Sequence, residues 1–272
     1  MNEGGMKLSQ QSDPLDRPLV FVSGAPRSGT SLVTKVIDAH PDIAVLMENI
    51  FGNRRRHWMK ANFWNSSETL RREVVEVFKN LEEPIVGNKV CTPDVWSADD
   101  IMMFCNLFKD FKIVFVVRDP VQVALSRLNR EDYEAEFSED ARHNMLLDFR
   151  SRFLTYASSW RQSIESYWKL RDGHPGKVYL LYYEDFCNQF EFQLGTLCDF
   201  LQVSFSANML NWHQLPHHDA RGNLKRDIKY KDAPVAVHQS DTKKLAEVTR
   251  NALSDALLAV KWQRDIWQAH QL

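Results

Sequence analysis

A glycine-containing segment near the start of the chain has the composition of an anion-binding loop. It reads GAPRSGTS over residues 24–31. Glycines let the backbone turn sharply, so that several N–H groups point at one anion at the start of a helix. The spacing from Gly24 to Gly29 matches the phosphate loop GxxxxGK, but Thr30 stands where that loop has its lysine. Because an NTPase needs this lysine on the terminal phosphates, we expect a phosphate cradle that does not handle a triphosphate.

Several side chains of this loop can hold an anion. Ser28, Thr30 and Ser31 carry hydroxyl groups, and Gly29 gives the chain the freedom to turn. Arg27 adds a positive charge inside the loop. The alternative is a glycine-rich turn without a ligand, in which the arginine pairs with solvent or a neighbouring acid. A strand before the loop and a helix after it favour the phosphate site.

A second anion site is expected after the run KIVFVV at residues 112–117. This run is apolar on both faces, as a central parallel strand should be, and it ends at Arg118. A charged residue at the carboxyl end of such a strand faces the place where open α/β sheets bind ligands. Arg118 can offer two donors to a phosphate, and Ser126 can add a hydroxyl group. Alone, Arg118 would indicate a surface ion pair, but beside the first loop it indicates a second phosphate.

Strands and helices alternate along the chain around these two sites. We expect strands at 19–23, 84–86, 112–117 and 178–182, and helices at 28–39, 66–81, 97–108, 120–128, 138–171, 186–201 and 241–262. This alternation predicts an α/β fold of three layers, with a central, mainly parallel sheet flanked by helices. The polar residues 1–17 are expected to form a flexible N-terminal segment, and 18–272 a single domain.

Composition excludes several classes of partner. Lys and Arg number 34 against 36 Asp and Glu, so the bulk charge favours neither nucleic acid nor an acidic membrane surface. No stretch reaches the about 18 apolar residues of a membrane span. The four cysteines form no CxxC pair, which favours reduced thiols in a cytoplasmic protein. His213, His217 and His218 could suggest a metal site, but Pro216 prevents a regular helical spacing, and we expect no metal.

These motifs resemble those of the PAPS-dependent sulfotransferases, which use 3′-phosphoadenosine-5′-phosphosulfate as donor. The family's two cofactor motifs are similar to PRSGTS at 26–31 and to the Arg118–Ser126 pair. Its strand–YED–helix segment is similar to VYLLYYEDF at 178–186. A late GNxxR element is similar to the segment with Gly222, Asn223 and Arg226. The similarity is nearest to the tyrosylprotein and bacterial branches. It implies a P-loop-type fold in which the first loop holds the 5′-phosphate and Arg118 with Ser126 the 3′-phosphate.

The resemblance also implies roles in catalysis. Sulfuryl transfer to a hydroxyl group needs a base, and positive charge where the nucleotide leaves. Arg27 is expected to stabilise the leaving group, and Lys89 to be a second cation. Glu48 is the expected base, although it stands one residue out of register with the tyrosylprotein pattern, and we expect it in partly dry surroundings that raise its pKa. Cys91 replaces the histidine of the cytosolic branch, and a thiol is a poor general base.

Other interpretations remain open for the acceptor and the reaction. The acceptor is a hydroxyl group of a small molecule, a carbohydrate or a peptide. The aromatic residues near Glu48 could bind it, although aromatics more often pack in a core; they are Phe51, Trp58, Phe63, Trp64 and Trp96. A P-loop kinase or NTPase with Asp119 on magnesium is one alternative reaction. A nucleotide-binding module in which Glu48 is idle is the other.

Overall fold

A parallel sheet lies at the centre of the structure, a computed structural model that describes residues 13–48, 67–135 and 149–225. Within these residues the sheet has five strands, in the order β2-β3-β1-β4-β5. The strands are β1 (Leu19–Gly24), β2 (Ile43–Met47), β3 (Ile85–Lys89), β4 (Phe111–Val117) and β5 (Val178–Tyr182). The connection from β1 leads to β2 at one end of the strand order, whereas the connection from β3 leads to β4 on the other side of β1. Open α/β sheets bind ligands where the direction of the connections changes in this way.

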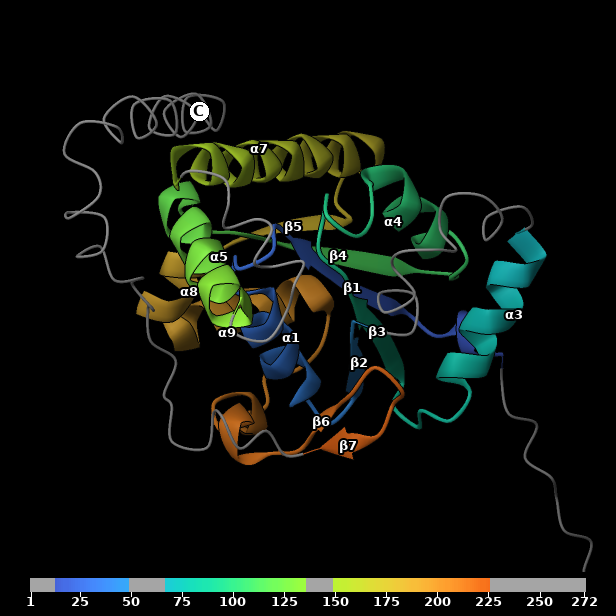
Figure 1. Ribbon diagram of the computed structural model, residues 1–272. Coiled ribbons are helices and arrows are strands. Elements are labelled where there is room, and N and C mark those ends of the chain that lie inside the picture. The colour runs from blue at the N-terminus through green and yellow to red at the C-terminus, as the bar shows by residue number, and fades with distance from the viewer. Residues whose placement is uncertain (1–12, 49–66, 136–148, 226–272) are drawn as a thin grey trace, which may run out of the picture.

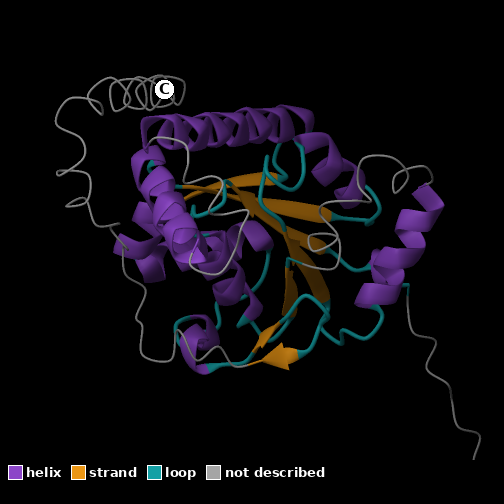
Figure 2. Cartoon of the chain, in the orientation of Figure 1, coloured by secondary structure: helices purple, strands orange, loops and turns teal. Residues whose placement is uncertain are grey.

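Helices cover both faces of this sheet (Figure 1, Figure 2). They are α1 (Thr30–Asp38), α3 (Ser67–Phe78), α4 (Ala98–Cys105), α5 (Pro120–Ala135), α7 (Phe149–Gly173), α8 (Tyr183–Asn188) and α9 (Phe190–Leu201). Helices α3, α4 and α7 pack on one face, α1, α8 and α9 pack on the other, and α5 packs on α7. The predicted three-layer α/β fold with a parallel sheet is thereby confirmed.

Alternation along the strands divides the core into two clusters. In β4, Phe111, Ile113 and Phe115 lie in the cluster under α4 and α7, whereas Val114 and Val116 lie in the cluster under α1 and α9. Successive side chains of a strand point to opposite faces, so a run that is apolar throughout fits a strand buried on both sides. This explains why the run at residues 112–117 was recognisable as a central strand.

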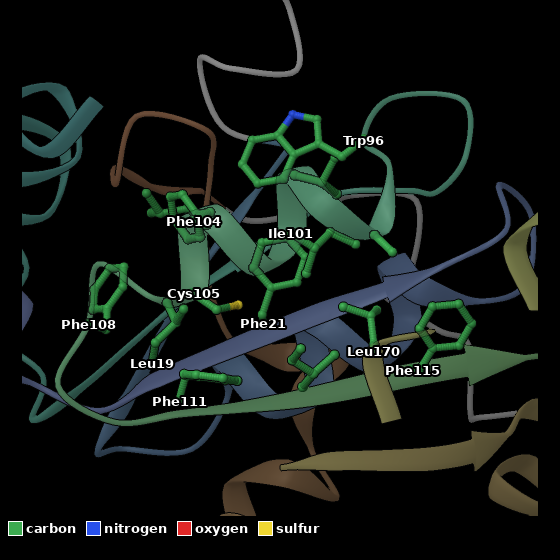
Figure 3. Packing of buried hydrophobic residues seen from close by; sticks show 14 of the residues in the cluster. Leu19, Phe21, Trp96, Ile101, Phe104, Cys105, Phe108, Phe111, Phe115 and Leu170 are labelled. Carbon is green, nitrogen blue, oxygen red and sulfur yellow. The ribbon is translucent and has the colours of Figure 1, made fainter. Parts of the chain in front are cut away.

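Aromatic rings fill the cluster under α4 (Figure 3). Phe21 of β1 stacks on Trp96, with ring centroids 5.7 Å apart, and Trp96 also contacts Phe104 at 5.3 Å. Trp96 is 1% exposed, so this member of the candidate acceptor aromatics packs in the core. The other four candidates, Phe51, Trp58, Phe63 and Trp64, lie outside the described residues.

Strand β2 was not expected from the sequence. A buried carboxylate, that of Asp38, bonds to its outer edge. The carboxylate of Asp38, at the end of α1, accepts a hydrogen bond from the backbone N–H of Val45 at 2.7 Å. The same carboxylate accepts bonds from the N–H and the Nδ1 of His218, both at 2.8 Å. Burial alone would raise the pKa of Asp38, but its bonds with His217 and His218 outweigh that effect and lower it. The buried carboxylate thus joins α1, the edge of β2 and the segment around His218.

That segment is a small hairpin of β6 (His217–His218) and β7 (Leu224–Lys225), preceded by short 3-10 turns. In Figure 1 the hairpin lies at the bottom of the view, well away from α5. The expected helix at 186–201 is divided at Gln189, whose backbone leaves the helical region, so that α8 and α9 are separate helices. The expected helix at 241–262 lies outside the described residues.

Part of the N-terminal segment packs against the rest of the chain. A 3-10 turn at Pro14–Asp16 buries Leu15 in the core. The guanidinium group of Arg17 donates to the carbonyl oxygens of Phe78 at 2.6 Å, Leu81 at 2.7 Å and Glu83 at 3.1 Å, at the end of α3. Within the described residues the packed structure therefore begins no later than Asp13. The division into a segment 1–17 and a single domain 18–272 stays a prediction.

Candidate functional site

Because the strands are parallel, the residues that follow each strand lie at the same edge of the sheet, the one formed by the carboxyl ends of the strands. The groups at this edge are the glycine-containing loop after β1, Glu48 after β2, Lys89 at the end of β3, Arg118 after β4 and Tyr183 after β5. The two central strands end level with each other, since Gly24 of β1 pairs with Val116 of β4. The edge therefore holds most of the residues that the sequence singled out.

The loop after β1 can be formed only by glycine at two positions. Gly24 and Gly29 have φ angles of +149° and +95°, in a region that disfavours side chains. A Cβ atom on Gly24 would lie 2.3 Å from the carbonyl oxygen of Val116, and one on Gly29 would lie 2.2 Å from the ring of Tyr183. The Oγ atom of Ser28 is fully buried in this loop and has no hydrogen-bond partner among the described residues. An unpaired buried hydroxyl beside the start of a helix fits a ligand that brings its own oxygen atoms.

The remaining hydroxyl groups of the loop begin helix α1. Thr30 is 3% exposed, and its Oγ1 lies 3.7 Å from the Sγ of Cys91. Ser31 is half-buried. The N-cap residue of α1 is Gly29, which supplies no side-chain cap. The first N–H groups of α1 therefore keep capacity for an anion, and Cys91 lies beside that place.

The two predicted anion sites are direct neighbours. The Nε of Arg27 donates to the Oγ of Ser126 at 3.0 Å, and the Nη1 of Arg118 donates to the carbonyl oxygen of Arg27 at 3.1 Å. Arg118 is 6% exposed, and its guanidinium carbon lies 4.6 Å from the ring centroid of Tyr183. Residues 27, 118 and 126 were each predicted to bind phosphate, and the structure places Arg27 in contact with both of the others.

Sequence reasoning did not assign a role to Tyr183, although the YED sequence was noted. This buried ring supports both anion sites, because it packs against Gly29 and under the guanidinium group of Arg118. The next residue, Glu184, accepts a hydrogen bond from the N–H of Asp119 at 3.0 Å. Burial raises the pKa of Glu184, although this hydrogen bond acts in the opposite direction. The two residues attach the end of β5 to the turn after β4.

Asp119 occupies a structural position at the start of α5. Its Oδ1 accepts hydrogen bonds from the N–H groups of Val121 at 2.9 Å and Gln122 at 3.1 Å. Such bonds satisfy the unpaired donors of a helix N-terminus. The acid that the kinase alternative needs for magnesium is thus engaged in capping a helix.

Lys89 and Glu48 form an ion pair at the ends of β3 and β2. The Nζ of Lys89 lies 2.5 Å from Oε1 of Glu48; the lysine side chain is 2% exposed and the glutamate side chain 55%. Burial alone would lower the pKa of Lys89, but Cys91 and Glu48 outweigh that effect and raise it, so the ammonium group stays charged. The expectation that Glu48 lies in partly dry surroundings is wrong, because its side chain is 55% exposed; its backbone is left-handed, with φ +48°.

The described part of the late GNxxR element lies in the β6–β7 hairpin, beside β2. Gly222, with φ +81°, and Asn223 form the turn between β6 and β7, where the N–H and Oδ1 of Asp219 bond to Asn223. A Cβ atom on Gly222 would lie 3.2 Å from Leu81 and 3.8 Å from Leu46, beside the outer strand β2. The structure does not bring Gly222 and Asn223 to Arg118 and Ser126. Arg226, the last residue of the element, lies outside the described residues.

The candidate metal histidines also lie in this hairpin region. His217 bonds through Nε2 to the carbonyl oxygen of Trp212 at 2.8 Å, and His218 bonds to Asp38. Among the described residues, no group of three or more His, Cys, Asp or Glu side chains is arranged to hold a metal ion. The absence of a metal from the reaction stays a prediction.

Comparison with known proteins identifies similar sequences and folds. The sequence profile of the Sulfotransferase family matches residues 18–207. Protein-tyrosine sulfotransferase 1 of Danio rerio is 23% identical over 74% of this chain, and the protein-tyrosine sulfotransferase of Drosophila melanogaster is 24% identical over 72%. The chain spans 57% and 40% of the lengths of these two relatives.

The fold has a counterpart among solved structures. The sulfotransferase domain of the Synechococcus olefin synthase superposes with a TM-score of 0.55 at 16% identity, and the match covers 93% of this chain and 98% of that domain. At this identity the likeness concerns the fold. It agrees with the three-layer arrangement of helices about a parallel sheet.

The cytoplasmic location that we expected is wrong. The finding that contradicts it is the match to protein-tyrosine sulfotransferases. The expectation rested on four cysteines that form no CxxC pair, a feature that does not by itself determine where a protein is located. Across residues 13–48, 67–135 and 149–225, no helix is both long enough and apolar enough to cross a membrane.

The loop geometry predicts a large difference between two glycine-to-alanine substitutions. Gly29→Ala should lower the free energy of unfolding by at least about 1–2 kcal/mol, because the backbone is left-handed there and the new methyl group meets the ring of Tyr183. Gly195→Ala, in α9, is the matched control: nothing lies within 4 Å of its added Cβ, and alanine favours a helix. Urea unfolding measures both. Equal stability of the two variants would contradict the close packing of the loop on Tyr183.

Proposed function

This chain belongs to the sulfotransferase family, and we propose that it transfers the sulfuryl group of PAPS to the phenolic hydroxyl group of a tyrosine in a protein. The observation that carries the proposal is the contact of Arg27 with Ser126 and of Arg118 with Arg27. It makes the two predicted anion sites neighbours, as a nucleotide with phosphate at both its 5′ and 3′ positions requires.

The residues present fit such a nucleotide. The first loop combines a buried hydroxyl group without a partner, on Ser28, with two glycines that leave no room for a Cβ atom. We propose that this loop holds the 5′-phosphosulfate side, with Ser28, Gly29, Thr30 and Ser31. Arg118 and Ser126 would hold the 3′-phosphate through charged and neutral hydrogen bonds. When bound, PAPS supplies the sulfuryl group and a stable leaving group.

The side chains at the edge can then divide the chemical work. Glu48 would accept the proton of the acceptor hydroxyl group, since it carries a carboxylate at the surface of the site. Lys89 holds that carboxylate at the end of β3 and keeps a positive charge beside the reacting groups. Arg27, inside the loop, would stabilise negative charge on the departing oxygen. Cys91, next to Lys89 and Thr30, is not expected to act as a base.

The tyrosine acceptor is proposed from the relatives rather than from the site. Both relatives described above are protein-tyrosine sulfotransferases. An exposed Glu48 also suits an acceptor that presents its hydroxyl group from outside, as a tyrosine on another protein does. The kinase alternative is less well supported, because Thr30 replaces the lysine of that loop and Asp119 caps α5.

The 3′-phosphate site predicts a nucleotide-specific loss of affinity. Arg118→Ala should weaken binding of adenosine 3′,5′-bisphosphate by about 2–4 kcal/mol, as expected for the loss of a charged hydrogen-bonding partner. Adenosine 5′-phosphosulfate, which lacks the 3′-phosphate, should lose much less. Because Arg118 also bonds to the loop at Arg27, the difference between the two nucleotides is the informative quantity. Titration calorimetry measures it, and equal losses for both nucleotides would argue against a 3′-phosphate at Arg118.

The proposed base predicts a loss of turnover without a loss of nucleotide affinity. Glu48→Gln keeps an oxygen that can accept the bond from Lys89 but removes the proton acceptor, so kcat should fall about 10²–10⁴-fold. Labelled PAPS with a tyrosine peptide or a phenol gives kcat, and calorimetry gives the affinity for adenosine 3′,5′-bisphosphate, which should change little. Cys91→Ser is the control and should keep most of kcat. Full activity in Glu48→Gln would mean that the base is another residue.

A reaction without a metal predicts resistance to chelators. The transferred sulfuryl group carries less negative charge than a phosphoryl group, so cations of the chain such as Lys89 and Arg27 can stabilise it without magnesium. Sulfuryl transfer should therefore survive exhaustive treatment with EDTA. The measurement is the transfer of label from PAPS to the acceptor. Activity that disappears with EDTA and returns with magnesium would instead favour the kinase or NTPase reaction.

A further inference from the structure

A surface hollow lies between the loop that follows β3 and the N-terminal half of α7. Its volume is about 570 Å³. The loop contributes Pro93 and Asp94, and α7 contributes hydroxyl and amide groups, on Thr155, Ser158, Ser159 and Gln162. This hollow is separate from the residues proposed to hold the nucleotide, and none of the functions proposed above uses it.

The carboxylate of Asp94, in the lining of the hollow, is paired with the guanidinium group of Arg127. Asp94 receives the Nη2 of Arg127 at 2.7 Å and the Oγ of Ser159 at 2.8 Å. The Nη1 of Arg127 also donates to Ser159 at 3.1 Å, so the three side chains form a closed network. By contrast, no hydrogen bond joins the side chains of Ser158 and Gln162 to another of the residues that the structure describes. The hollow therefore offers neutral donors and acceptors rather than a net charge.

The hollow lies within reach of both halves of the proposed site. Asp94 lies five positions after Lys89, so their Cα atoms are at most about 18 Å apart. The same segment is attached to the first loop, because the N–H of Thr92 donates to the carbonyl oxygen of Gly24 at 3.1 Å. On the nucleotide side, Arg127 directly follows Ser126 on α5. An extended chain of about five residues can therefore lead from Lys89 to the hollow.

We propose that this hollow binds the main chain of a peptide acceptor, a few residues from the tyrosine that receives the sulfuryl group. The inference rests on the proposed function. A peptide main chain presents neutral N–H and C=O groups at short intervals, which the hydroxyl and amide groups of Ser158 and Gln162 complement. Leu154, also part of the lining and 38% exposed, offers an apolar contact to a side chain of the peptide. A single phenol is too small to occupy both the hollow and the reacting site.

The test compares a peptide with a small phenol as acceptors. Ser158→Phe should fill the hollow and raise KM for a tyrosine peptide of about ten residues by about tenfold, the equivalent of about 1.4 kcal/mol. Its kcat/KM for 4-nitrophenol should stay within about twofold of the parent value. Arg161→Phe is the control, since Arg161 is exposed on α7 but does not line the hollow. Gln162→Ala, at an exposed position, should raise KM for the peptide alone and guards against misfolding of the first variant.

Direct binding separates this inference from the proposed function. A labelled peptide that contains phenylalanine in place of the tyrosine should bind the complex of the protein with adenosine 3′,5′-bisphosphate, as measured by fluorescence anisotropy. Ser158→Phe should weaken that binding and Arg161→Phe should not. Equal binding of the peptide by both variants would overturn the inference. If Ser158→Phe instead weakened the binding of an oligosaccharide and left that of the peptide unchanged, the hollow would be a carbohydrate site and the inference would also fail. A protein that binds the peptide but sulfates no tyrosine would refute the proposed function and leave the hollow as a peptide site.

Discussion

The parallel pairing of the strands is the constraint on which the site depends. Antiparallel strands would send successive ends to opposite edges, whereas these five strands all end at the same edge. Because of this, residues as far apart in sequence as Arg27, Glu48 and Arg118 are carried to the same edge. The contacts seen there, from Arg118 to Arg27 and from Arg27 to Ser126, then fix the position of a loop that glycine alone can form.

The sequence predicted those parts of the site that short patterns encode. The glycine spacing, the buried run before Arg118 and the alternation of strands and helices are local signals, and they led to the correct fold and to residues that meet in space. Tyr183 was not found because its role depends on two partners, Gly29 and Arg118, that are distant in the chain. Gly222 and Asn223 match the GNxxR element in sequence, but the structure shows them in a hairpin turn beside β2. A pattern cannot reveal which side of a sheet a later segment will reach.

The edge strand β2 shows how a polar residue can substitute for a neighbouring strand. An exposed edge presents unpaired N–H groups to other chains. Here the buried carboxylate of Asp38 takes the N–H of Val45 and at the same time anchors the hairpin through His218. Strand β2 was not predicted, although residues 43–47 are apolar throughout like the run in β4, and the acid that completes its edge belongs to a different element. Glu48 follows directly, so the anchoring of this strand also determines where the proposed base lies.

Arg17 bears on where this domain can be cut. The match to the family begins at residue 18, which invites an expression clone that starts there. Such a clone would omit the guanidinium group that bonds to three carbonyl oxygens at the end of α3, together with Leu15 in the core. These three hydrogen bonds are part-buried, so their loss is expected to destabilise the end of α3. The family match therefore begins after residues that pack against the described core.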